Sequence, residues 1–283
     1  MICVTYSVRA VLATMAVLAA VPAQASSVIA DWNFGTLTTT APYNAPAATG
    51  GSAAASSSAT SLNMANSYAE ASYAGSAYTF DDITSDTNST IGNKNVWRLR
   101  GSSTSATQSG ANGWSINAPQ YAQGAQFNAT TAGYSNVVLS FNWAATAQGI
   151  ANLQVQYTTN GTSWTNVGSL LTATIGNSST GGSFQTDTID FGALGITGVN
   201  NDTNFGVRLV AAYNPTLGNY ASASSVIAGA PAAYNTSSGN WRFADVQIDG
   251  TPVSAVPLPG AVWLLGSGLL GVVGLSRRRR PSV

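Results

Sequence analysis

The C-terminal tail, residues 256–283, restricts the fold and location of this 283-residue chain more than any other stretch. It begins with Val256, Pro257, Leu258, Pro259 and Gly260, continues as an uncharged apolar run to Leu275, and ends with Arg277, Arg278, Arg279 and Arg280. A helix of about 17–25 apolar residues can cross a bilayer, and residues 258–275 reach that length. Arginines beside such a helix stay on the cytoplasmic side. The tail therefore predicts one transmembrane helix over 258–275, with the preceding residues outside the membrane.

The N-terminus has the features of a second targeting segment. Arg9 lies near the start of residues 1–25, an apolar stretch follows, and the segment ends in Ala23-Gln24-Ala25. This is the order of a secretory signal peptide with an A-x-A cleavage site. The sequence therefore predicts export, with a mature chain that starts at Ser26. A buried N-terminal helix is the alternative.

The tail resembles a known sorting signal. Its order of Val-Pro-Leu-Pro, then Trp-Leu-Leu-Gly-Ser-Gly-Leu-Leu-Gly, then an arginine cluster is similar to the PEP-CTERM signal, in the variant that begins Val-Pro-Leu-Pro. Where that family usually has Glu between the prolines, this chain has Leu258. The resemblance implies that an exosortase, a membrane protease with a cysteine-protease-like site, recognises the tail and cuts near the prolines. It also implies delivery to the surface of a bacterium, often one that makes exopolysaccharide. The alternative is a plain membrane anchor that is never cut.

Residues 26–253, between the two targeting segments, contain neither cysteine nor histidine. This absence excludes a disulfide framework, a thiol nucleophile, a Ser-His-Asp triad and a His/Cys zinc site. Stability must therefore come from a packed core, and the region is long enough to form one.

The charge of this region also limits its partners. All ten acidic residues of the chain lie in it, but only five of the ten basic residues do, which gives a net charge of −5. A modestly acidic surface repels nucleic acid, so we expect no nucleic-acid partner.

The region 26–253 has the pattern of an all-β domain. Residues 36–77 are rich in Ala, Ser and Thr and predict a segment that is partly loop or disordered. The rest alternates short apolar runs with turn residues, and the strands that we expect are 28–34, 96–100, 125–129, 137–143, 153–157, 163–167, 170–175, 184–191, 205–210 and 241–248. Asn160-Gly161 predicts a hairpin with a type I′ turn. Many short strands without an amphipathic helix predict a β-sandwich or jelly roll, with 205–210 and 241–243 in inner strands.

A second resemblance concerns this region. Residues 133–137, 156–161, 205–209 and 241–243 are similar to a β-sandwich module of PEP-CTERM proteins and other secreted bacterial proteins. The similarity covers about half of the region and implies a fold, but almost nothing about activity. That module often ends in Trp-Arg-Phe-Asp-Asn, where this chain has Ala244 and Asp245 after Phe243. An ion site that needs the missing Asp is therefore not implied.

Two kinds of binding residue stand out. Exposed tryptophans can stack on sugar rings, and Trp114 and Trp164, which lie beside turn residues, are the candidates for glycan stacking; a place in the core is the alternative for each. Asp81, Asp82 and Asp86 offer three carboxylates within six residues, so they form a candidate structural Ca²⁺ site. Solvated turn residues are the alternative. No other cofactor is indicated, and Arg98, Arg208 and Arg242 are expected to form structural ion pairs with Asp.

These observations predict a non-enzymatic protein that is exported, transiently anchored in the membrane, and then placed at the cell surface or in the extracellular matrix. Its domain would contribute to adhesion or biofilm through exopolysaccharide or Ca²⁺-dependent contacts. The alternative is a secreted polysaccharide hydrolase that uses a pair of Asp carboxylates. The pairs available to it are Asp81 with Asp82, Asp187 with Asp190, and Asp245 with Asp249. A structural protein without any small ligand is the third possibility.

Overall fold

The computed structural model of this chain describes residues 24–38, 45–64, 81–87, 91–99, 114, 118–147, 149–174, 183–223, 239–253 and 268. Residues 25–253 form one compact unit, and residues 1–24 with 254–283 are grouped as a second. The predicted signal peptide up to Ala23 lies outside the described residues, as does the predicted sorting signal except for Gly268. Within the described part of the chain, no helix is long and apolar enough to span a membrane.

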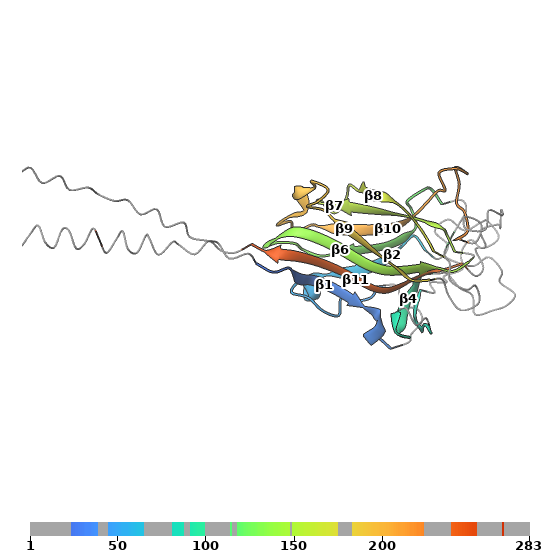
Figure 1. Ribbon diagram of the computed structural model, residues 1–283, viewed down its shortest axis with the longest axis horizontal. Coiled ribbons are helices and arrows are strands. Elements are labelled where there is room, and N and C mark those ends of the chain that lie inside the picture. The colour runs from blue at the N-terminus through green and yellow to red at the C-terminus, as the bar shows by residue number, and fades with distance from the viewer. Residues whose placement is uncertain are drawn as a thin grey trace, which may run out of the picture. The chain divides into compact units, whose positions relative to one another are not determined.

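The unit 25–253 is mostly β, as the alternating sequence predicted, and its strands form two antiparallel sheets (Figure 1). Sheet A has the order β3-β4-β11-β6-β9, with β1 also paired to β11. Its strands are β1 (Ser27–Asn33), β3 (Asp82–Ser85), β4 (Asn95–Leu99), β6 (Tyr134–Ala145), β9 (Gln185–Asp190) and β11 (Trp241–Pro252). Sheet B has the order β2-β5-β10-β7-β8. Its strands are β2 (Ser58–Leu62), β5 (Gly124–Asn128), β7 (Asn152–Thr158), β8 (Thr165–Thr172) and β10 (Gly206–Ala212).

Strand β11 joins most of sheet A. One of its edges pairs with β6 over nearly its whole length, and its other edge is shared end to end by β4 and β1. A register shift between Phe243 and Asp245 separates the two halves. At this junction Lys94 Nζ lies 2.5 Å from Asp245 Oδ2, so an ion pair connects the start of β4 to the centre of β11. Residues 241–243 therefore lie in an inner strand, as expected. The same holds for the segment 205–210, because β10 lies between β5 and β7 in sheet B.

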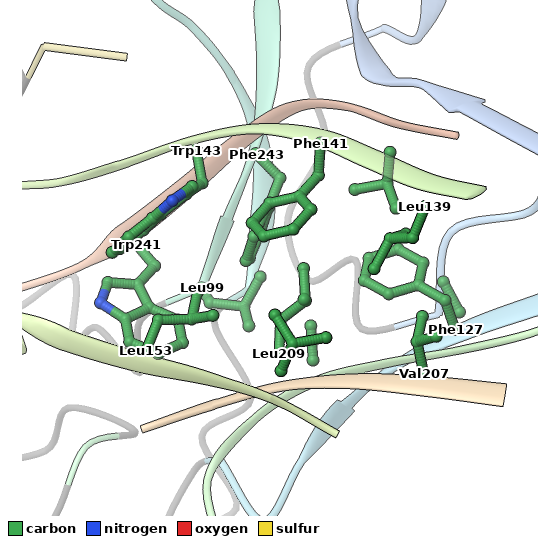
Figure 2. Close-up of a cluster of buried hydrophobic side chains, with 14 of the residues drawn as sticks. Leu99, Phe127, Leu139, Phe141, Trp143, Leu153, Val207, Leu209, Trp241 and Phe243 are labelled. Atoms are coloured by element: carbon green, nitrogen blue, oxygen red, sulfur yellow. The ribbon is translucent and has the colours of Figure 1, made fainter. Parts of the chain in front are cut away.

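The core lies between the two sheets, and Figure 2 shows its side chains pointing toward one another from both sides. Alternation along the strands selects these residues, because successive side chains point to opposite faces. Sheet A contributes Phe141, Trp143, Trp241 and Phe243, all of them buried. Phe127 of sheet B meets the Trp97 ring of sheet A at 6.0 Å in an edge-to-face arrangement, a favourable geometry for aromatic pairs.

Three details differ from the sequence-based expectation. Strand β2 lies inside the segment 36–77, which was expected to be partly loop or disordered and for which no strand was predicted; only Ala59 of its five residues is buried, so it shows little apolar alternation. The two expected strands 163–167 and 170–175 are parts of the single strand β8, which is interrupted by an irregular register near Gly168. The φ of Gly168 is +68°, a backbone conformation that glycine adopts without strain.

The hairpin at Asn160-Gly161 is also longer than predicted. Strand β7 ends at Thr158 and β8 begins at Thr165, so the connection is not a two-residue turn. Gly161 has a φ of +73°, whereas Asn160 is not among the residues with positive φ, and a type I′ turn needs both. Instead, the Asn160 side-chain oxygen accepts hydrogen bonds from the backbone N–H groups of Thr162 and Ser163, at 2.9 and 2.8 Å.

The buried ion pair between Arg242 and Asp86 gives the first prediction. Arg242 Nη1 lies 2.5 Å from Asp86 Oδ2, and the Asp86 side chain is fully buried. The change Asp86→Asn removes the buried negative charge that faces Arg242, so we expect the free energy of unfolding to fall by about 3–5 kcal/mol. Urea unfolding followed by tryptophan fluorescence measures this loss. The control is Lys94→Gln, which breaks the more exposed Lys94–Asp245 pair and should cost at most about 1 kcal/mol; equal losses would contradict the prediction.

Candidate functional site

The outer face of sheet B, which points away from the core, is the most distinctive polar surface of the described residues. On β10, Val207 and Leu209 enter the core, so Arg208 between them points outward. The neighbouring strands place amide and hydroxyl side chains beside it. We call this side of the sheet the amide face, and its members are Gln126, Asn128, Gln154, Gln156, Thr158, Asn166 and Arg208. Of these, Gln154, Gln156 and Thr158 are buried, and the others are partly or fully exposed. Among these described residues the face carries one positive charge and no carboxylate.

Hydrogen bonds fix the side chains of the amide face in a row across three strands. Arg208 Nε donates to Gln126 Oε1 at 2.8 Å, and Gln126 Nε2 donates to Asn128 Oδ1 at 3.1 Å. Asn128 Nδ2 in turn donates to the hydroxyl of Ser58 on β2, at 3.3 Å. On the other side, Gln156 Nε2 donates to Asn166 Oδ1 at 2.9 Å. The row is therefore ordered before any ligand arrives.

Trp164 lies on this face because of the connection between β7 and β8. The Thr158 hydroxyl accepts the N–H groups of Asn160 and Gly161, at 3.2 and 3.0 Å, so the chain folds back over the end of the sheet. The Trp164 ring then covers Gly206, where an added Cβ would lie 3.2 Å from the ring and 2.6 Å from Asn128 Oδ1. A larger residue at 206 would push the Asn128 side chain aside and press on the ring, so glycine at this position lets the ring lie close to the sheet.

The Trp164 ring stacks on the guanidinium group of Arg208, whose Cζ lies 3.9 Å from the ring centroid. Such cation–π contacts are favourable by about 0.5–2 kcal/mol. Arg208 was expected to form an ion pair with an aspartate, and the structure shows the tryptophan and Gln126 in that place. Burial lowers the pKa of Arg208 from its ordinary value, although an arginine remains protonated at neutral pH.

A shallow pocket of about 270 Å³ adjoins this stack at the end of sheet B. Its walls carry no charged side chain and include Ser56, Asn128, Thr130, Gly161, Thr203 and Asn204. Asn128 belongs to both the pocket and the hydrogen-bonded row of the amide face. Asn128 thus links the pocket through Gln126 to Arg208, and we take the pocket and the Trp164–Arg208 stack together as the candidate site.

Trp114, the other predicted stacking residue, lies in the core. It is 1% exposed and its ring lies 4.8 Å from that of Trp241. The prediction of a sugar-stacking role for Trp114 is therefore wrong, because a sugar cannot reach the ring. The turn residues beside Trp114 in the sequence suggested exposure, yet the ring is bulky and apolar enough to fill space between the sheets.

The predicted Ca²⁺ site is represented only in part by the described side chains. Asp81 and Asp86 are both buried, and the Asp86 carboxylate is bonded to Arg242, which confirms the ion pair expected for that arginine. The side chain of Asp82 lies outside the described ones. Among the described side chains, no group of three or more acidic or other metal-binding residues is close enough to hold an ion. Ca²⁺ at these residues stays a prediction.

The aspartates proposed for a hydrolase have structural partners. Asp245 and Asp249 lie on the same outer face of β11, but Asp245 pairs with Lys94 and Asp249 accepts two hydrogen bonds from Gln247. Asp187 accepts hydrogen bonds from Trp143 Nε1 at 2.7 Å and Gln185 Nε2 at 2.9 Å. Asp190 accepts the backbone N–H of Ala193 at 2.9 Å. Each of the four carboxylates thus has a structural contact that explains its place in the fold without a catalytic role.

The chemistry of the candidate site suits a polyhydroxylated ligand. An aromatic ring, a guanidinium group and a row of amides offer stacking together with hydrogen-bond donors and acceptors. A scan against protein-family models finds no match to this chain, and a search of curated proteins finds none either.

The coupling between Trp164 and Arg208 gives the second prediction. The variants Trp164→Ala and Arg208→Ala both lose the contact between the ring and the guanidinium group, and the double variant loses it only once. We expect a double-mutant cycle to show a coupling of about 0.5–2 kcal/mol in the free energy of unfolding. Urea unfolding of the four proteins measures it. Losses that add to within about 0.3 kcal/mol would show that the two side chains do not interact.

Proposed function

We propose that residues 26–253 form a glycan-contacting domain of jelly-roll β-sandwich type in an exported, non-enzymatic bacterial surface protein. The strand order supports this fold. If the eight strands from β4 to β11 are numbered 1 to 8, the order β4-β11-β6-β9 in sheet A becomes 1-8-3-6. The order β5-β10-β7-β8 in sheet B becomes 2-7-4-5. This is the pairing order of a jelly roll, a fold common in lectin domains; β1, β2 and β3 are additions to it.

The ordered Trp164–Arg208 stack on the amide face is the observation that carries the glycan-binding proposal. Sugar hydroxyls need both hydrogen-bond donors and acceptors, which amide side chains supply together. The side chains already hold one another in place, so a ligand does not have to order them, and less conformational entropy is lost on binding. The structural partners of Asp187, Asp190, Asp245 and Asp249 favour binding over hydrolysis.

Sorting to the surface is the second part of the proposal and rests on the sequence. The signal peptide, cleaved between Ala25 and Ser26, would direct export. The tail helix over 258–275 would hold the chain in the membrane until an exosortase-type protease cuts near Pro257 and Pro259. The protein would then remain at the cell surface or in the matrix, in contact with exopolysaccharide.

Binding to immobilised polysaccharides tests the glycan contact. We expect the purified protein to be retarded in affinity gels that contain bacterial exopolysaccharide, without release of reducing sugar. The variant Trp164→Ala should reduce retardation about tenfold or more, because stacking and the order of Arg208 are both lost. The control Thr188→Ala, on the outer face of sheet A, should bind as the unchanged protein does. Sugar release that is lost on one Asp→Asn change would instead support the hydrolase.

The mass of the surface protein tests sorting. We expect intact mass measurement on cells that make the protein to show a form that starts at Ser26 and lacks the four C-terminal arginines. Changing Pro257 and Pro259 to Ala should leave the full tail attached and the protein in the membrane fraction. Recovery of only tail-bearing protein from unaltered cells would support the plain anchor.

A further inference from the structure

We propose that the amide face selects acidic polysaccharides and that Arg208 binds an oxyanion group of the sugar, a uronic acid carboxylate being the simplest case. This inference rests on the glycan-binding function proposed above and adds the substrate class. It starts from the isolation of Arg208. Lys94 pairs with Asp245 and Arg242 with Asp86, whereas within the described part of the chain no carboxylate pairs with Arg208.

The protein fixes the guanidinium group but uses little of its hydrogen-bonding capacity. The Trp164 ring covers the guanidinium group, with Arg208 Cζ 3.9 Å from the ring centroid. Arg208 Nε donates a hydrogen bond to Gln126. The described residues accept no hydrogen bond from either Nη group. A guanidinium fork binds carboxylate and similar oxyanions through two parallel hydrogen bonds, and it loses less entropy when already held in place. The geometry therefore leaves the two-pronged end of Arg208 for a ligand.

The energetic setting favours an anion as well. A partly buried cation without a counter-ion is costly, and its interaction with an arriving anion is stronger than in bulk water. The neighbours Gln126, Gln156 and Asn166 are neutral, so none of them competes with the ligand for the charge. Residues 26–253 carry a net charge of −5 and repel anionic chains in general, so binding of an acidic glycan would have to come from the local contact with Arg208 and not from overall charge attraction.

The neighbouring pocket supplies room for an adjacent sugar. Its volume of about 270 Å³ is slightly below that of typical drug-sized ligand sites, which suits a single sugar ring. Asn128 and Gly206 connect the pocket to the Trp164 ring. A glycan chain could thus place one ring in the pocket while the oxyanion of a nearby ring meets Arg208.

Matched polysaccharides test this inference on the purified full chain. Polygalacturonate and its fully methyl-esterified form share a backbone and differ in the carboxylate charge. We expect the unchanged protein to bind polygalacturonate about tenfold more tightly, the gain of one charge-assisted contact. Arg208→Gln should reduce this ratio to about one, and Arg208→Lys, which keeps the charge without the fork, should give an intermediate ratio. Melting temperatures of the variants and of the control Thr188→Ala verify that they are folded.

Each outcome has a distinct meaning. Equal affinity of the unchanged protein for both forms would overturn the acidic preference and leave the glycan-binding function intact. Absence of binding to these glycans and to bacterial exopolysaccharide would overturn both. A ratio that Arg208→Gln leaves unaltered would place the oxyanion contact elsewhere and overturn the role of Arg208. A comparison of dextran sulfate with dextran distinguishes the sources: a larger ratio there than for polygalacturonate supports the oxyanion contact and identifies sulfate as its group.

Discussion

The packing of aromatic side chains between the two sheets is the interaction on which the rest of the structure depends. Residues 26–253 contain no cysteine, so no disulfide can hold the sheets together. The rings of Trp143 and Trp241 lie 5.5 Å apart on neighbouring strands of sheet A, and Phe127 of sheet B meets Phe243 at 6.3 Å. Because these residues alternate with outward side chains, the same strands that form the core also fix which groups appear on the two outer faces.

The two outer faces have different electrostatic character. On sheet A, carboxylates gather along β1 and β11: burial raises the pKa of Asp31, and repulsion from Asp245 adds to the rise, while Lys94 opposes it. Asp245 and Asp249 thus repel Asp31, and Lys94 offsets part of this repulsion. On sheet B, neutral amides surround one arginine that an aromatic ring covers. Among the described residues, negative charge therefore gathers on the outer face of sheet A, whereas the outer face of sheet B presents the cation Arg208 among neutral side chains.

Much of the fold could be predicted from the sequence, because the inner strands alternate apolar and polar residues. Residues 137–143, 153–157 and 205–210 became β6, β7 and β10 for this reason. The edge strand β2 could not be found, because only Ala59 on it is buried. For the site, Trp164 was identified from its place after a turn, but its partner Arg208 was not. A stack between residues on β10 and on the connection to β8 depends on strand register, which no local pattern reveals.

The pairing of β1 with β11 brings both ends of the unit 25–253 to one end of the sheets, since Ser27 lies opposite Gly250 and Pro252 opposite Tyr134. The pocket lies at this same end, because β5 reaches it at Asn128 and continues through a short loop into β6. Tension applied to the chain at Val253 would run along β11, which is hydrogen-bonded to neighbours on both edges. The bonds to β6 and β1 would then be loaded together in shear and would not open one after another. Strand β11 would therefore resist such a pull through both of its neighbours at once, so the domain would bear mechanical load between the proposed attachment at its C-terminus and a ligand in the candidate site.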